Sequence, residues 1–498
     1  MLEVVNEVRL TIRPDNDHPF LQGPFRSNAR EYTADTDSLK VIGEIPRDLH
    51  GMFVRNHHNQ VHEPLGTYHP FDGDGMLHAM RFENGRAEYR NRFVRTTGFY
   101  AEQAAGRSLW PGLLAPDLGA HRGWGAMGAM KDNAGTDVKC HAGRLLASMS
   151  QGSEPWRLDP YTLQTLGPDA NWARKVPDGV ASHYKVDNFT GEMMFFNYPE
   201  HPPYMNYGVV DRDNQLVHYE AIELPGARWP HDLGITEHYT VLHDLPLYFD
   251  AEGLKKGQHK LVFNRDQPAR FGILPRRGKN ASVRWFEAKP CYILHTTNCF
   301  EAGDEVIMDG CIMPDYKTVP VGQITNVYER IRANLDKHNN PTRMYRWRFN
   351  LASGRTSELQ IDEEITEFPV CSNDYLGRPY RYSYNVLYKK GDWLFSGLKR
   401  FDMRSGATAR FEYGEGRYGS EPQVARALNA RAEDDGYVIS MIADIETDTS
   451  EIMILRADDI AAGPVARIIL PERMGIGTHA CWVEGDRLEG EKRRPVLN

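Results

Sequence analysis

Several features that organise other proteins are missing from this chain of 498 residues. Its six cysteines are scattered and form no Cys-x-x-Cys pair, so we expect reduced core cysteines of a cytoplasmic protein and neither a disulfide framework nor a cysteine-bound zinc ribbon. No apolar run approaches the roughly 18 residues of a membrane-spanning helix. The stretch before Asp15 lacks an apolar segment of signal length, so we expect neither a membrane span nor secretion.

Positive charge is also in short supply. The 59 lysines and arginines are outnumbered by 68 acidic residues, which gives a formal net charge of −9. The basic residues form no stripe along the chain, so we expect no nucleic-acid partner and no binding to anionic membrane surfaces. The remaining composition, 41% hydrophobic and 26% charged, is ordinary for a soluble globular protein.

Short alternating runs separated by turn residues dominate the sequence. Examples lie at 87–95, 192–197 and 436–442, and Asp-Gly-Asp-Gly at 72–75 is one of the turn clusters. This texture predicts an all-β fold, either a sandwich, a barrel or a propeller, with a few helical stretches expected, chiefly 100–109 and 324–338. No linker or low-complexity tract divides the chain, so we expect one domain over 1–498. A propeller suits this length best, because about seven blades of about 70 residues fill it.

Local metal-binding motifs are absent, yet four histidines stand in distinctive settings. They are His183 in Ser-His-Tyr-Lys, His231 in Trp-Pro-His-Asp, His295 in His-Thr-Thr-Asn and His479 in Gly-Thr-His-Ala. A single histidine is more often a hydrogen-bonded core or surface residue than a ligand. Inner strands of a propeller all face one axis, however, so one histidine from each of four blades can meet there. The four together predict a metal site whose ligands are far apart in sequence.

Such a site needs acceptors for the second nitrogen of each imidazole ring, and buried carboxylates commonly serve. Glu367 in Thr-Glu-Phe-Pro and Glu421 in Gly-Ser-Glu-Pro are candidates because each lies in an apolar context marked by proline. Four neutral imidazoles differ from the two-histidine, one-carboxylate set of other non-haem oxygenases. Iron would keep open positions for dioxygen, whereas a closed structural zinc site is the alternative.

A series of motifs makes a family resemblance specific. Arg55-Asn56 precedes Phe-Asp-Gly-Asp-Gly-Met at 71–76, and His-Ala-Gly-Arg-Leu-Leu at 141–146, Arg-Trp-Phe at 284–286 and Glu-Asp-Asp-Gly-Tyr at 433–437 follow in order. In this order, from 43 to 482, the chain resembles the carotenoid cleavage oxygenases. Within that superfamily it is most similar to the bacterial lignostilbene dioxygenase and isoeugenol oxygenase branch.

The resemblance implies a seven-bladed propeller with a dome of helices and loops over the metal-bearing face. It implies one Fe(II) per chain held by the four histidines named above, with Glu367 and Glu421 as partners of the ligand rings. The third such glutamate of the family falls on Gln151, a neutral amide that can accept a ring N–H without supplying negative charge. Thr136 falls where the family places a side chain that crowds one open position of the iron.

The resemblance also implies a substrate. Members that act on phenolic compounds place a tyrosine and a lysine at the substrate's 4-hydroxyl, and Tyr100 and Lys131 match these positions, with Phe99 as the alternative to Tyr100. A lysine ammonium there would stabilise a phenoxide, whose ordinary pKa is near 10. We therefore expect an oxygenase that cleaves a 4-hydroxyphenyl alkene, such as a stilbene or a phenylpropene, with O2 to give aldehydes.

Three alternatives remain open at this point. An apocarotenoid is the other substrate class within the family, and a propeller that binds a protein or sugar without catalysis is the alternative outside it. Structural zinc in the same four-histidine cage is the third. A homodimer is compatible with the sequence, which does not decide the oligomeric state.

Overall fold

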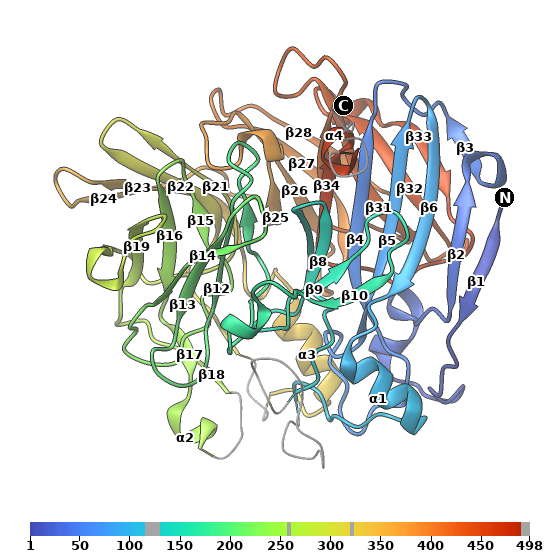
Figure 1. The fold of residues 1–498 in the computed structure, drawn as a ribbon, viewed down its shortest axis with the longest axis horizontal. Coiled ribbons are helices and arrows are strands. Elements are labelled where there is room, and N and C mark those ends of the chain that lie inside the picture. The colour runs from blue at the N-terminus through green and yellow to red at the C-terminus, as the bar shows by residue number, and fades with distance from the viewer. Residues whose placement is uncertain (115–129, 256–259, 319–322, 490–498) are drawn as a thin grey trace.

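The computed structural model describes residues 1–114, 130–255, 260–318 and 323–489. Within them the chain forms seven antiparallel sheets that surround a central axis, a seven-bladed β-propeller with few helices (Figure 1). The innermost strand of each sheet is an edge strand, and these strands are β7 (Asp137–His141), β11 (Lys185–Val186), β15 (Gly234–Ile235), β21 (Tyr292–Ala302), β25 (Thr366–Val370), β30 (Gln423–Arg426) and β34 (Ala480–Glu484). Contacts between sheets join β34 to β7 and β30, β7 to β11, and β21 to β15 and β25. The all-β, seven-bladed prediction is confirmed.

Five sheets are four-stranded blades, and in four of them the strands are consecutive in the chain. They comprise β7 (Asp137–His141), β8 (Arg144–Ser148), β9 (Trp156–Leu158) and β10 (Thr165–Pro168); β11 (Lys185–Val186), β12 (Met193–Asn197), β13 (Asn206–Val210) and β14 (Leu216–Ala221); β15 (Gly234–Ile235), β16 (Tyr239–Asp244), β19 (Ala269–Pro275) and β20 (Arg284–Ala288); β21 (Tyr292–Ala302), β22 (Glu305–Met313), β23 (Arg343–Asn350) and β24 (Thr356–Gln360); and β25 (Thr366–Val370), β26 (Tyr382–Tyr388), β27 (Phe395–Asp402) and β28 (Thr408–Glu412). A separate hairpin joins β17 (Leu247–Phe249) to β18 (Leu261–Phe263).

The other two sheets close the ring by combining both ends of the chain. One contains β1 (Glu3–Glu7), β2 (Arg30–Asp35), β6 (Arg86–Phe93), β5 (Asp74–Glu83), β4 (Gly51–Asn59) and, from the opposite end, β34 (Ala480–Glu484). The other contains β29 (Arg417–Tyr418), β30 (Gln423–Arg426), β31 (Gly436–Asp444), β32 (Thr449–Arg456), β33 (Pro464–Ile469) and β3 (Lys40–Gly43). Each closure depends on pairing between residues more than 400 positions apart, such as Trp482 with Phe53 and Ile468 with Val41.

The alternation read from the sequence places side chains on the two faces of each blade. In β23, Tyr345, Trp347 and Phe349 are buried on one face, whereas Arg346 and Arg348 lie on the more exposed face. Successive side chains of a strand point to opposite faces, so this pattern packs one face against the neighbouring blade. Apolar clusters of this kind fill the spaces between adjacent blades and hold the inner strands in place.

The helices are short and most lie on one side of the propeller. Figure 1 shows α1 (Thr97–Ala105), α2 (Ala251–Leu254) and α3 (Val327–Leu335) along the lower edge, and α4 (Gly485–Glu489) on the opposite side. The Thr96 hydroxyl caps α1 by accepting from Phe99 N, and Gly106 ends it in the left-handed conformation. Both expected helices exist, with shifted ends. Among the described residues, no helix is long and apolar enough to cross a bilayer.

Candidate metal centre

The four histidines singled out from the sequence lie on four different blades, at or beside the innermost strands. His183 comes shortly before β11 and His231 shortly before β15, whereas His295 lies within β21 and His479 directly precedes β34. All four are buried, with exposed fractions of 8% or less. The propeller therefore brings these remote positions to one place on its axis.

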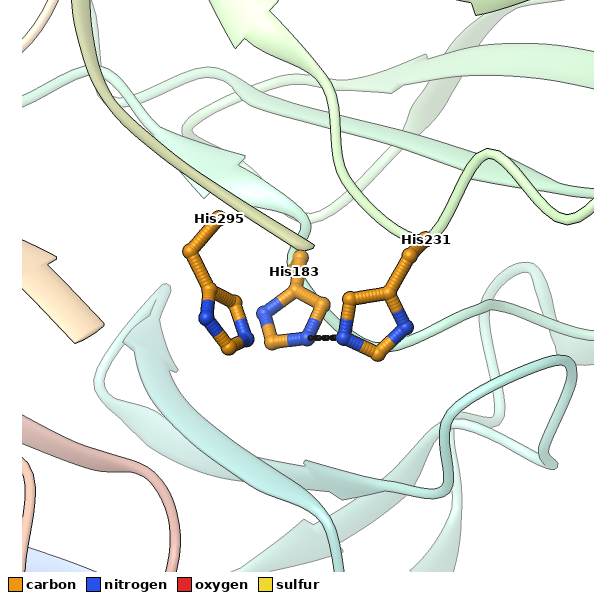
Figure 2. A group of neighbouring side chains, drawn as sticks. All are labelled: His183, His231 and His295. Atoms are coloured by element: carbon orange, nitrogen blue, oxygen red, sulfur yellow. Dashed lines mark hydrogen bonds between the residues drawn. The ribbon is translucent and has the colours of Figure 1, made fainter. Parts of the chain in front are cut away.

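Three of the imidazoles converge on a common point (Figure 2). One nitrogen each from His183, His231 and His295 lies within 4.8 Å of the others, and the Nε2 atoms of His183 and His231 are 3.2 Å apart. Metal–nitrogen bonds of about 2.1 Å place neighbouring ligand nitrogens about 3 Å apart when they meet at a right angle. The 3.2 Å separation of the His183 and His231 Nε2 atoms therefore fits two ligands of a single ion, and one nitrogen of His295 lies within 4.8 Å of both.

The His479 ring packs against two of these three rings. Its ring centroid lies 4.4 Å from that of His183 and 4.8 Å from that of His295, with the rings nearly perpendicular in both pairs. Phe368 packs against the same group, 4.5 Å from the His295 ring and 4.9 Å from the His479 ring. This aromatic wall was not anticipated from the sequence, although Phe368 directly follows the predicted Glu367.

The backbone at two of the histidines is in the left-handed region, with φ of 68° at His183 and 65° at His231. This conformation costs a non-glycine residue free energy, and residues that adopt it are found mostly at functional sites. Here it directs each ring from a short segment preceding its strand toward the axis. Phe368, with φ of 47°, shows the same feature beside the cluster.

Polar contacts tie the ligand-bearing segments to one another. Asp232, which follows His231, accepts a hydrogen bond from the backbone N–H of Thr296, which follows His295, at 2.7 Å. The other oxygen of Asp232 pairs with the ammonium of Lys185 at 2.7 Å, two residues beyond His183. One buried carboxylate therefore fixes three ligand segments relative to each other.

Both predicted glutamates lie against ligand histidines. Glu367 Oε2 is 2.5 Å from His295 Nδ1, and Glu421 Oε1 is 3.3 Å from His479 Nδ1. Burial opposes the charge of Glu421, but the nearby His479 and Lys139 hold the pKa of its carboxyl below the usual value. Each ring therefore donates from Nδ1 to a carboxylate, which leaves Nε2 free to bind a metal ion.

The other two histidines differ in their surroundings. His183 Nδ1 lies 3.5 Å from Asp137 Oδ2, a carboxylate that the sequence analysis did not identify. His231 Nδ1 has no hydrogen-bond partner among the described residues. Gln151, the position at which the resemblance places a glutamate, is buried and donates to the carbonyl oxygen of Tyr198 at 3.4 Å.

The donor set fits a divalent metal ion. Burial holds the pKa of His183 and of His231 well below the ordinary value, and neighbouring imidazoles lower it further, so both rings are neutral at pH 7. His295 Nε2 is buried without any hydrogen-bond partner in the described structure. Neutral, desolvated nitrogens that face one centre are what a divalent transition-metal ion requires.

A cavity that we call the Lys131 cavity lies beside α1. Its lining includes the predicted residues Lys131 and Thr136, with apolar walls formed by Tyr68, Phe71, Trp110 and Met130. Thr136 also links the cavity to the histidines, since its carbonyl oxygen accepts from the hydroxyl of Thr478, next to His479, at 3.1 Å.

The two residues expected to meet the substrate are placed differently. The Lys131 side chain is only 9% exposed and its ammonium contacts two carboxylates, Asp74 at 2.5 Å and Glu102 at 2.6 Å. Tyr100 is 58% exposed and is not among the residues lining the cavity, because it lies on the outward side of α1. Phe99, the alternative position, is buried and carries no hydroxyl. The structure thus brings Lys131, but not Tyr100, to the cavity.

These features define a propeller with a cluster of buried histidines on its axis that is consistent with a metal site, and comparison with known proteins identifies its class. Residues 25–484 match the family model described as retinal pigment epithelial membrane protein. The chain belongs to this family, the carotenoid cleavage oxygenases, which are iron-dependent and include enzymes that cleave alkene double bonds. The resemblance inferred from the motifs is confirmed.

Several relatives match over nearly the whole chain. The carotenoid 9,10(9',10')-cleavage dioxygenase of Crocus sativus is 33% identical and the match covers 95% of this chain and 90% of that protein. The isoeugenol monooxygenase of Pseudomonas putida is 28% identical, covering 94% and 98%. The crystal structure of the lignostilbene dioxygenase of Pseudomonas brassicacearum superimposes with a TM-score of 0.82 at 27% identity, covering 95% of this chain and all of that one.

Proposed function

We propose that this protein is an Fe(II)-dependent oxygenase that binds one iron per chain and cleaves a carbon–carbon double bond, with one alkene and one O2 giving two carbonyl groups. The convergence of His183, His231 and His295 on one point, with His479 beside them, carries this proposal. When bound there, ferrous iron supplies the activation of dioxygen. The protein's own residues orient the imidazoles, exclude water and hold the alkene.

The substrate class that we propose first is a 4-hydroxyphenyl alkene, and the support is Lys131 in the cavity wall. An ammonium has three donors, and Asp74 and Glu102 occupy two of them. The third can donate to a substrate hydroxyl. The expectation from the sequence was that this ammonium stabilises a phenoxide. Because two carboxylates flank the one ammonium, the cluster instead carries net negative charge and disfavours a phenoxide. The hydroxyl therefore stays protonated and donates its hydrogen to a carboxylate oxygen.

An apocarotenoid is the second candidate substrate, and two observations favour it. Tyr100 lies outside the cavity, so the expected tyrosine–lysine pair is not assembled there. Part of the cavity wall is apolar, formed by Tyr68, Phe71, Trp110 and Met130, and the Crocus relative acts on carotenoids. A polyene with a polar end group at Lys131 would satisfy the same contacts.

Metal analysis of the purified protein and a product assay test the proposal together. We expect about one iron per chain in the wild-type protein and a loss of both iron and turnover in His295→Ala. His243→Ala is the matched control, because His243 is fully buried in β16 and lies outside the cluster. Wild-type protein without bound iron, or iron unaffected by His295→Ala, would refute the metal site.

The substrate classes are separated by three compounds. We expect 4-hydroxystilbene to give two aldehydes and 4-methoxystilbene, which cannot donate a hydrogen bond, to react much more slowly. Faster turnover of a polyene of retinoid length would favour the apocarotenoid. Iron-loaded protein that cleaves none of these compounds would count against both substrate classes.

A further inference from the structure

The seven innermost strands bring a repeated arrangement of side chains to the axis. In chain order, each blade contributes one histidine or carboxylate at or beside its inner strand: Asp137, His183, His231, His295, Glu367, Glu421 and His479. Six of these positions were expected to belong to the metal centre. Asp137, the first residue of β7, is the seventh.

Each of these carboxylates lies against a histidine from an adjacent blade of the propeller. Glu367 lies on the blade after His295 and contacts its Nδ1, and Glu421 lies on the blade before His479 and contacts its Nδ1. Asp137 lies on the blade before His183 and stands in the same relation to it. Its Oδ2 is 3.5 Å from His183 Nδ1 and accepts from the His183 backbone N–H at 3.2 Å.

We propose that Asp137 is the third carboxylate of the metal centre, a positioning residue that orients His183 and supplies the negative charge that Gln151 does not. This inference rests on the proposed function. The carboxylate is completely buried, so its charge acts at low dielectric. By accepting from the His183 backbone N–H and lying 3.5 Å from Nδ1, it orients the ring with Nε2 facing the Nε2 of His231 at 3.2 Å.

The consequence is a rearrangement of charge with no change in its amount. Glutamates at 151, 367 and 421 would have provided three carboxylates, and Asp137, Glu367 and Glu421 provide three here. The histidine without a carboxylate is then His231, whose Nδ1 has no partner in the described structure. His183, rather than His231, is therefore the histidine whose bond to the metal a carboxylate strengthens.

A purely structural role for Asp137 is the competing explanation. Its other oxygen accepts from the backbone N–H of Val138 at 2.7 Å and pairs with the ammonium of Lys139 at 2.9 Å, contacts that support the start of β7. The two roles predict opposite results for Lys139. If Asp137 serves the metal, removing its competing cation leaves more negative charge for His183, whereas a strand-supporting pair fails when either member is lost.

The test measures affinity for Fe(II) and for Co(II) by chelator competition, with thermal unfolding of the metal-free protein as a second readout. We expect Asp137→Asn to weaken metal binding about 10–100-fold, the range found for partners of ligand histidines. Lys139→Met should bind metal at least as tightly as wild type. Asp169→Asn is the matched control, since Asp169 is buried, pairs with Arg157 at 2.8 Å and contacts none of the four histidines in the described structure.

Metal affinity in Asp137→Asn equal to that of wild type would overturn the proposal. So would an equal loss in Asp169→Asn, or a loss in Lys139→Met matching that of Asp137→Asn. Because Lys139 also lies near Glu421, Lys139→Met is measured in the Glu421→Gln background as well. Should Asp137→Asn not fold, a loss of metal affinity on adding Lys139→Met to Glu421→Gln would overturn the proposal, and an unchanged or higher affinity would support it. Wild-type protein that binds no metal would instead refute the proposed function, which keeps the two failures distinct.

Discussion

Replacing Lys131 by methionine should destabilise the protein strongly before any effect on substrate is considered. The ammonium is nearly buried and contacts Asp74 at 2.5 Å and Glu102 at 2.6 Å. Burial opposes its charge, but these two carboxylates raise the pKa of Lys131 above its ordinary value. Methionine keeps much of the side-chain volume and leaves two buried negative charges facing each other. Removing one partner of a buried ion pair costs about 3–5 kcal/mol of unfolding free energy.

The size of this loss should depend on pH in a defined direction. Burial raises the pKa of Asp74 to about 6 even with Lys131 present, and Lys131 itself lowers it, so the substitution moves it higher. An acid whose pKa is higher in the folded than in the unfolded state favours folding when protonated, and this stability is lost as pH rises through the folded pKa. The deficit of Lys131→Met should therefore be largest above pH 6 and shrink toward pH 5.

Urea unfolding followed by tryptophan fluorescence between pH 5 and 8 measures this effect. The control is Lys131→Met combined with Glu102→Gln, which removes one of the two stranded charges and should recover part of the loss at pH 8. A deficit that is the same at pH 5 and pH 8, or a double variant no more stable than the single one, would refute the reasoning. Loss of turnover in Lys131→Met is informative about substrate only after folding is shown.

Three further substitutions have expected outcomes. Glu367→Gln should weaken iron binding about 10–100-fold by chelator competition, because the amide no longer supplies charge to His295. His479→Ala should leave less than one iron per chain by metal analysis while the fold, followed by far-ultraviolet circular dichroism, is retained. Trp482→Ala should lower unfolding free energy by about 3–5 kcal/mol in urea, since its buried ring packs where β34 closes the ring on β4; a change below about 1 kcal/mol would show that the closure does not depend on this side chain.

Most of the fold was predictable because its signals are local. The alternating segments 87–95 and 436–442 correspond to β6 and β31. The absence of a linker, together with the length of the chain, favoured a propeller. The ends of the helices were less predictable: α1 starts at Thr97 because Thr96 caps it, and ends early because Gly106 adopts φ of 65°. That all 498 residues form one domain stays a prediction.

The candidate site was predictable in part, and the difference has a physical reason. His183, His231, His295 and His479 stand in recognisable motifs, as do Glu367 and Glu421, so each could be named without knowing its neighbours. Asp137 carries no motif of its own. It becomes a candidate only when β7 and the segment before β11 are known to be adjacent. Tyr100 failed to reach the cavity for a related reason, since its side of α1 depends on the cap at Thr96.

The propeller explains how a charge can move within the centre without loss of the site. Every inner strand faces the same axis, so a carboxylate lost from one position can be replaced from another blade, provided that the new blade adjoins a ligand histidine. Asp137 meets this condition through β7 and His183. The exchange is not neutral for each ligand, because a carboxylate makes the ring it accepts from a stronger donor. His183 should therefore bind the ion more strongly here than His231, and the loss of metal on replacing His183 should exceed that on replacing His231.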